Sequence, residues 1–182
     1  MSDTFAQGHA VVDFWESIGP DGWFNKNDAI DAQFREQFLA TYEQAANREC
    51  MHWLEAARPG LGLILLLDQF PRNAFRGSVR VYESDPLARE VADRFIERGF
   101  MAQITPPLRM FVRLPFSHSE DLADQDRAVA LHREHIDDDT QWAEHHRDII
   151  RKFGRFPHRN AILGRDSTPE EEAFLSDGGF QG

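Results

Sequence analysis

Apolar residues recur along this chain mostly at the three- and four-residue spacings of helices that bury one face. The clearest case begins after Asn27 or Asp28, either of which can cap a helix. Its apolar positions follow at intervals of four, four, four and three, namely Ile30, Phe34, Phe38, Tyr42 and Ala45. This spacing predicts an amphipathic helix that packs by the stripe.

Residues 61–77 break the one-sided pattern, because the run at 63–67 is apolar without interruption. We predict a fully buried helix here, since leucine favours helices and no other stretch supplies strands for a buried strand to pair with. Arg58, Pro59 and Gly60 are expected to separate this helix from the preceding one. Pro71 is expected to end it near Gln69, which makes residues 68–76 a helix end and a short loop.

Start and stop signals of the same kind predict further helices, at residues 10–17, 49–57, 85–99, 105–111, 117 to beyond 129, 142–153 and 168–175. The Ser-x-x-Glu spacing of Ser117 and Glu120 predicts a capping box, followed by a helix with Leu122 and Val129 on its packed side. The fold class predicted is therefore all-α, a compact array of about eight to nine helices. Residues 1–182 are expected to form a single domain with a loose tail at 176–182.

Composition narrows the functional classes. A net charge of −11 repels phosphate backbones, so no nucleic acid is expected as a partner. The apolar runs are too short to cross a bilayer and the N-terminus lacks the pattern of an export signal, so no membrane partner is expected. The single Cys50 cannot form an internal disulfide, which fits a cytoplasmic location. No standard metal, nucleotide or hydrolase motif occurs, so neither metal nor cofactor is expected.

Two polar clusters carry the candidate chemistry. The first, at the end of the apolar run, comprises Asp68, Gln69, Arg72, Asn73 and Arg76, and the second comprises Arg155, His158, Arg159 and Asn160. Guanidinium and amide donors gathered in this way predict the binding of a small anion such as a phosphate or a carboxylate. The alternative is an internal network, in which Asp68 pairs with Arg72 and the amides satisfy carbonyls at the helix end.

The two clusters share a short repeat, because residues 70–75 and 156–162 both read Phe-Pro, then Arg-Asn-Ala, with one insertion in the second copy. The repeat predicts a supersecondary unit used twice, in a solenoid-like or bundle architecture. It also predicts that Arg72-Asn73 and Arg159-Asn160 lie close enough to share one ligand.

Three residues are candidates for catalysis. His118 and Glu120 place an imidazole and a carboxylate two positions apart at a predicted helix start, where both can face one cleft. The capping box explains Glu120 without any chemistry. His146 is the third candidate, although its place on an apolar stripe is more typical of a hydrogen-bonded core histidine. Whether any reaction is catalysed stays open.

Four segments, VVDFW, LDQFPRNAFRG, LPFSHSEDLADQ and HRDIIRKFGRFPHRNAILGRDSTPEE, resemble the signature blocks of the bacterial family catalogued as domain of unknown function 924. Together they span nearly the whole chain. The resemblance implies an all-helical fold related to tetratricopeptide repeats, and it brings no established activity. The aromatic residue usual after the first Trp of the family is Glu16 here, which lies outside both polar clusters.

Three classes of function follow, in order of preference. The first is a binding protein or enzyme for a small anionic ligand. The second is a tetratricopeptide-like module that grips a peptide, and the third is a purely structural protein. Polar residues concentrated in two short segments suit a pocket better than an extended groove. The sequence leaves the oligomeric state open.

Overall fold

The structure is a computed structural model that describes residues 4–134 and 140–181. Within these residues it contains nine α-helices, four short 3-10 helices and no strand, which confirms the predicted all-α class and helix number. The described residues group into two compact units. Unit 1 lies within Met1–Arg76 and Arg80–Pro115, and unit 2 within Gly77–Val79 and Phe116–Gly182. The tetratricopeptide-like character stays a prediction.

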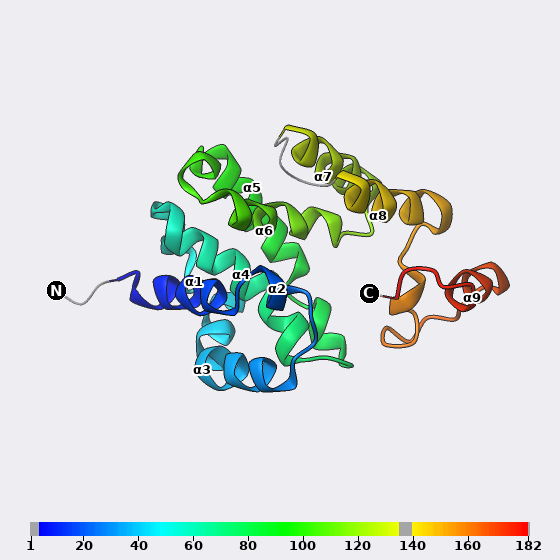
Figure 1. The fold of residues 1–182 in the computed structure, drawn as a ribbon, viewed down its shortest axis with the longest axis horizontal. Coiled ribbons are helices and arrows are strands. Elements are labelled where there is room, and N and C mark those ends of the chain that lie inside the picture. The colour runs from blue at the N-terminus through cyan, green and yellow to red at the C-terminus, as the bar shows by residue number, and fades with distance from the viewer. Residues whose placement is uncertain (1–3, 135–139, 182) are drawn as a thin grey trace. The chain divides into compact units, whose positions relative to one another are not determined.

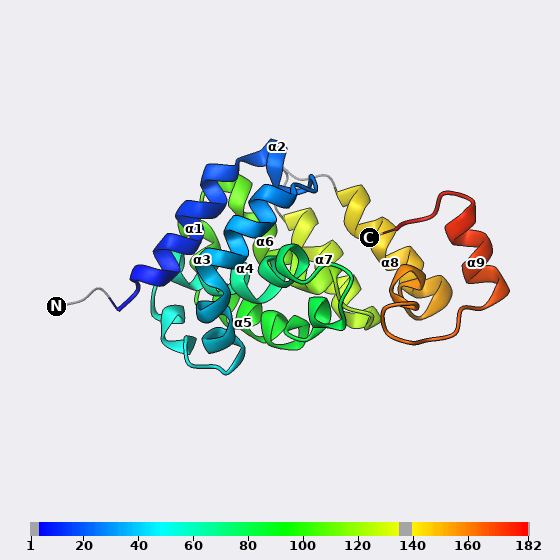
Figure 2. The same cartoon turned by 90° about the horizontal axis from the view of Figure 1, so that it is seen from below.

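Unit 1 is built around one central helix, α4 (Ala57–Ala74). The other α-helices that begin in this part of the chain are α1 (Ala6–Ile18), α2 (Pro20–Trp23), α3 (Asp28–Ala46), α5 (Asp85–Glu97) and α6 (Pro106–Ser117). The 3-10 helices are η1 (Met51–Glu55), η2 (Val79–Tyr82) and η3 (Phe100–Gln103). In both views α1 and α3 lie alongside α4, which also packs against α5 (Figures 1 and 2).

Burial of α4 on all sides confirms the prediction made from its leucine run, since every residue from Pro59 to Pro71 is buried. Two glycines let α1 approach α4 closely. A Cβ atom at Gly62 would meet the carbonyl oxygen of Gly8, and one at Gly8 would lie 2.7 Å from the Cβ of Pro59. The close approach of α1 therefore depends on glycine at both positions.

Both predicted ends of α4 are wrong. The helix begins at Ala57, so Pro59 and Gly60 lie in its first turn, where proline is tolerated because those N–H groups have no partner within the helix. The helix also continues through Pro71 to Ala74. Residues 68–74 are therefore the last two turns of the helix.

A side chain from another segment explains how α4 passes Pro71. Proline lacks the N–H that would bond the carbonyl of Leu67 four residues earlier. The hydroxyl of Ser84 donates to this carbonyl oxygen instead, at 2.6 Å. Because the buried carbonyl keeps a partner, the helix continues without an unsatisfied polar atom at this point.

Unit 2 contains α7 (Leu122–Glu134), α8 (Thr140–Phe153), the 3-10 helix η4 (Pro157–Arg159) and α9 (Pro169–Ser176). Helices α7 and α8 lie side by side in both views (Figures 1 and 2). The buried residues Ile149, Ile150 and Phe156 form a core, and Phe153, Phe174 and Phe180 pack against it. Phe180 belongs to the tail for which the sequence predicts a loose segment, and its ring lies on this core.

The predicted capping box of Ser117 and Glu120 is wrong. Ser117 is still inside α6, and the start of α7 is capped by Asp121, whose Oδ1 accepts from the backbone N–H of Ala123 at 2.7 Å. Leu122, predicted on the packed side, is 43% exposed, whereas Val129 is buried. The local spacing fits a box, but the carboxylate of Glu120 has partners far along the chain.

The repeated Phe-Pro motif does not form the same structure twice. Its first copy is the last part of α4, while the second follows Gly154, whose φ of 69° ends α8, and forms η4. The left-handed glycine and the inserted His158 give the second copy a different backbone. No helix in the described part of the chain is both long and apolar enough to cross a bilayer.

Candidate functional site

The first polar cluster lies in unit 1, on the last turns of α4. Arg72 donates from Nη1 and Nη2 to the two carboxylate oxygens of Asp85, at 2.9 and 3.1 Å. Its Nη1 also lies 3.3 Å from Oδ1 of the fully buried Asp68. Burial acts to lower the pKa of Arg72, but the two carboxylates together hold it above its ordinary value. Arg72 is thus engaged by two internal anions.

The remaining members of this cluster also contact internal partners. Asn73 Nδ2 donates to Asp31 Oδ1 at 2.7 Å, and Arg76 Nε donates to Asp31 Oδ2 at 2.6 Å. Gln69 Nε2 donates to Asp68 Oδ2 at 2.6 Å. These contacts describe the internal network that the sequence offers as the alternative. Ligand binding at these five residues stays a prediction, as does their proximity to the Arg159-Asn160 pair, which belongs to unit 2.

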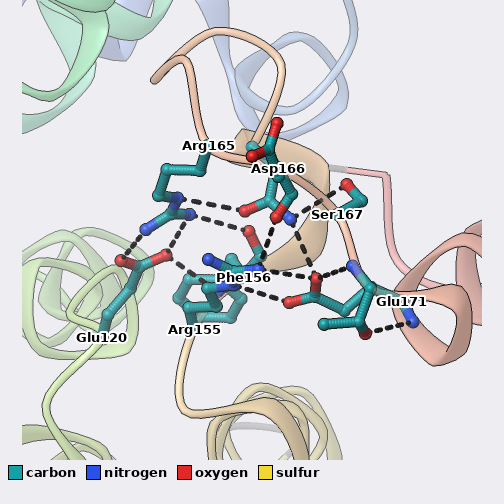
Figure 3. A network of polar contacts seen from close by, with 9 residues as sticks. Glu120, Arg155, Phe156, Arg165, Asp166, Ser167 and Glu171 are labelled. Atoms are coloured by element: carbon teal, nitrogen blue, oxygen red, sulfur yellow. Dashed lines mark hydrogen bonds and ion pairs between the residues drawn. The ribbon is translucent and has the colours of Figure 1, made fainter.

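The second cluster forms a network of paired charges in unit 2 (Figure 3). Arg155 donates hydrogen bonds to both carboxylate oxygens of Glu171, at 2.6 and 2.8 Å. Arg165 donates to both carboxylate oxygens of Glu120, at 2.7 and 3.0 Å. Asn160 joins the two pairs, because its Oδ1 accepts from Arg165 Nε and its Nδ2 donates to Glu171 Oε2. The hydrogen bonds from Arg155 are the main reason that the pKa of Glu171 is about 2.

Glu120 belongs to this network, and its role as a candidate catalytic residue stays a prediction. Besides Arg165, it accepts from the backbone N–H of Phe156 at 2.8 Å. Burial raises the pKa of Glu120, but the bonds from Arg165 and Phe156 outweigh burial and hold the pKa below its ordinary value. The carboxylate stays ionised and committed to both partners. It thereby fastens the segment that begins at Phe156 to the segment before α7.

The network positions four further predicted residues, which we call the His/Arg group: His118, His146, His158 and Arg159. His146 lies on α8, His158 and Arg159 lie in η4, and His118 lies between α6 and α7. Arg159 is 7% exposed, and its Nη2 donates to the carbonyl of His118 at 2.9 Å. The guanidinium carbon of Arg159 also lies 4.6 Å from the ring centre of Phe156. One buried cation and three imidazoles from three segments are thus brought together.

Two phenylalanine rings complete the surroundings of the His/Arg group. The ring centre of His146 lies 4.6 Å from that of Phe180 and 5.7 Å from that of Phe156. For His158 the corresponding distances are 5.0 and 5.6 Å. Both imidazoles therefore contact the same pair of apolar rings.

Hydrogen bonding differs between these two imidazoles. Nδ1 of His146 lies 2.7 Å from the carbonyl oxygen of Trp142, and since a carbonyl can only accept, we assign the ring proton to Nδ1. The Nε2 atom of neutral His146 is then an acceptor. In the described part of the chain the buried Nδ1 of His158 has no hydrogen-bond partner. An unpaired buried polar atom of this kind is uncommon and needs a reason.

Burial and nearby positive charge lower the pKa of both histidines to about 4. Burial is the largest cause for each. Arg159 acts in the same direction on both, and His118 adds to the effect on His146. At neutral pH the guanidinium of Arg159 is therefore charged and lies beside the neutral imidazoles of His146 and His158. Strongly shifted histidines gathered in this way are typical of functional sites.

Among residues 4–134 and 140–181, no three His, Cys, Asp or Glu side chains are arranged so that they could hold a metal ion. In the His/Arg group the guanidinium of Arg159 is a cation with several N–H groups, a chemistry that suits an anion.

Four of the predicted site residues are thus brought together, and three more, Glu120, Arg155 and Asn160, belong to the supporting network, whereas Arg165, Glu171 and Phe180 were not predicted as site residues. Phe180 follows the last periodic helix in a glycine-rich tail, and no pattern marks it. Arg165 and Glu171 carry the charges that complete the network, but their partners lie 45 and 16 residues away along the chain. Only the three-residue spacing of Thr168 and Glu171, which form a capping box on α9, gave a local signal.

Comparisons with known proteins extend over almost the whole chain. The family model described as "Bacterial protein of unknown function (DUF924)" matches residues 11–179. A solved structure of a protein of unknown function from Agrobacterium tumefaciens is 50% identical and superposes with a TM-score of 0.93, covering 97% of this chain and 100% of that chain. No curated protein matches the chain.

Proposed function

This chain belongs to the DUF924 family of bacterial proteins of unknown function, and since that membership brings no activity with it, we propose from the geometry of unit 2 that the protein binds a small anion at the His/Arg group. The observation that carries the proposal is the gathering of Arg159 with the imidazoles of His118, His146 and His158. A carboxylate or a phosphate is the ligand class that matches these groups.

The two-pronged contacts of Arg72, Arg155 and Arg165 each hold a carboxylate of the protein itself. Arg159 donates to the carbonyl of His118 and lies over the ring of Phe156. In the described part of the chain the buried Nδ1 of His158, the residue next to Arg159, has no hydrogen-bond partner, which supports a ligand in this region.

An anion would change the electrostatics of the group in its own favour. Positive neighbours lower the pKa of His146 and His158, so a bound negative charge acts against that effect and raises both. Protonation then adds two N–H donors and two charges that face the ligand. We therefore expect affinity for an anion to increase as the pH falls toward the pKa values of about 4, because binding and proton uptake are coupled.

Thermal unfolding with and without inorganic phosphate tests the proposal, using sodium chloride at matched ionic strength as the reference. A ligand at one hundred times its dissociation constant stabilises by about 2.7 kcal/mol, which for this size raises the melting temperature by roughly 5 to 10 °C. Citrate and pyrophosphate serve as further probes. A shift no larger than that given by chloride would remove the proposal and favour the peptide-gripping alternative.

Variants of the His/Arg group show where the anion binds. Arg159→Lys keeps the charge and loses the planar fork, and His158→Gln removes one imidazole, so each should reduce the phosphate-induced shift by more than half. Arg151→Lys is the matched control, because Arg151 lies on α8 and its Nη2 contacts the exposed Asp126 at 3.1 Å. Equal phosphate shifts in all three variants would place the anion elsewhere, and Arg72→Lys would then test the unit 1 cluster.

A further inference from the structure

Phe180 occupies a position that a ligand of the His/Arg group would be expected to reach. Its ring contacts the rings of His146 and His158 at steep interplanar angles of 65° and 85°. It also lies 6.2 Å from Phe156, the ring over which Arg159 lies. An aromatic ring thus already sits among the residues to which the proposed function assigns the anion.

The segment that delivers this ring is short and lightly fastened. Gly178, with a φ of 84°, turns the chain after α9, and the next residue donates from Gly179 N–H to the carbonyl of Phe174 at 2.8 Å. Gln181 Nε2 donates to the carbonyls of Leu175 and Gly179 at 2.9 and 3.0 Å. In both views the chain turns back from α9 toward α8 (Figures 1 and 2). These hydrogen bonds tie the tail to α9 and to itself.

Resting on the proposed function, we propose that Phe180 is a displaceable plug in an aromatic subsite of the anion site, and that the ligand carries an aromatic ring beside its anionic group. The rings of His146, His158 and Phe156 form the subsite, and Arg159 lies next to it. Ring edges pointing at ring faces suit a planar aromatic group in particular. Aryl phosphates and aryl carboxylates share this chemistry.

Displacement of the plug should weaken the apparent affinity of such a ligand. The apparent dissociation constant equals the intrinsic one divided by the fraction of molecules with an open subsite. If Phe180 leaves the subsite in about 1 to 10% of molecules, binding of an aryl anion is weakened by roughly 10- to 100-fold. Inorganic phosphate has no ring, so it can contact the charged end of the site with the plug in place.

Calorimetric titration of the full-length protein with phenyl phosphate, benzoate and inorganic phosphate tests this competition. Phe180→Ala removes the plug. Gly178→Ala strains the turn that places Phe180, because φ is positive at this residue; the new Cβ would meet no neighbouring atom, so the strain lies in the backbone alone. Each variant should bind phenyl phosphate or benzoate at least about tenfold more tightly than the wild type, with inorganic phosphate changed by less than about threefold. The aryl anion whose affinity increases more shows whether the site prefers a phosphate or a carboxylate.

Phe24→Ala is the control, since Phe24 is a 60% exposed ring in unit 1 and should leave all three affinities unchanged. If phosphate binds but the aryl anions bind Phe180→Ala and Gly178→Ala no more tightly than the wild type, the plug is overturned and the proposed function stays intact. Weaker aryl binding in Phe180→Ala would make Phe180 part of the ligand site, which also overturns the plug. Failure of every anion to bind any variant would remove the proposed function and the plug together.

Discussion

At the scale of single residues, His146 and His158 are half-buried neutral groups near a permanent cation. Their rings contact Phe156 and Phe180, and the guanidinium of Arg159 lies over the ring of Phe156. A histidine in the unfolded chain titrates near pH 6.5, whereas the pKa of His146 and His158 in the folded chain is about 4. Between these two pH values, protonation of the two histidines therefore favours the unfolded chain.

This competition predicts a pH dependence of stability. Between pH 4 and 6.5 the unfolded chain binds more protons than the folded chain, so the free energy of unfolding increases with pH and levels off above about 7. Acidification through this window should remove up to roughly 3 kcal/mol for each histidine. Urea unfolding at pH 7 and pH 5 measures the loss. His146→Gln should show a clearly smaller loss, and an unchanged loss in this variant would contradict the assignment.

Glu120→Gln should be costly, because the amide cannot accept both prongs of Arg165 and the N–H of Phe156 as an anion does. We expect a decrease of about 1.5 to 3 kcal/mol in the free energy of unfolding, typical of charge-assisted bonds in a partly buried setting. Glu144→Gln is the control, since Glu144 pairs with the exposed Arg133 and should cost less than about 1 kcal/mol. Equal costs in the two variants would argue against the network.

At the scale of elements, α4 shows how a distant side chain can keep a helix intact. Ser84 donates to the carbonyl of Leu67, which Pro71 leaves without its usual partner. Ser84→Ala should therefore cost about 1 to 3 kcal/mol. In a Pro71→Ala background the restored N–H can bond the same carbonyl, so the cost should be clearly smaller. A double-mutant cycle in urea gives the coupling, and strictly additive effects would refute this explanation.

The contact between α1 and α4 gives a second test at this scale. Gly62→Ala would press a methyl group against the backbone carbonyl of Gly8, whereas Gly60→Ala meets the Phe95 side chain at 3.2 Å. A side chain can give way more easily than backbone, so Gly62→Ala should destabilise by about 1 to 3 kcal/mol and Gly60→Ala by less. Thermal unfolding of the two variants gives the order, and the reverse order would contradict the close approach.

Local patterns in the sequence predicted the elements well and their partners poorly. The stripe of α3 and the leucine run of α4 predict buried helices because burial follows directly from periodicity. Pro71 and Glu120 were misread because the partners that decide their roles, Ser84 and Arg165, lie 17 residues beyond Leu67 and 45 residues beyond Glu120. The residue types of the His/Arg group were predicted, but the tail ring of Phe180 follows no pattern.

At the scale of the whole molecule, each unit contains a polar network of its own. In unit 1, Arg72 of α4 pairs with Asp68 and Asp85, and Arg76, just after α4, pairs with Asp31. In unit 2 two paired charges hold η4, and the His/Arg group lies beside them. A protein with a net charge of −11 thus keeps a local group of positive and protonatable side chains. Such a group suits a small anion that approaches against the overall charge and is held by close contacts.

The imidazole signals of His146 and His158, followed by NMR as a function of pH with and without saturating inorganic phosphate, test the central claim most directly. If each of the two protons makes phosphate bind about tenfold more tightly, so that the doubly protonated group binds phosphate about a hundredfold more tightly than the neutral group, the pKa of each histidine rises by about 1. The signals of His9 and His52 in unit 1 serve as internal controls and should not respond to phosphate. A pKa that stays at about 4 for both histidines while phosphate is present would contradict anion binding at the His/Arg group.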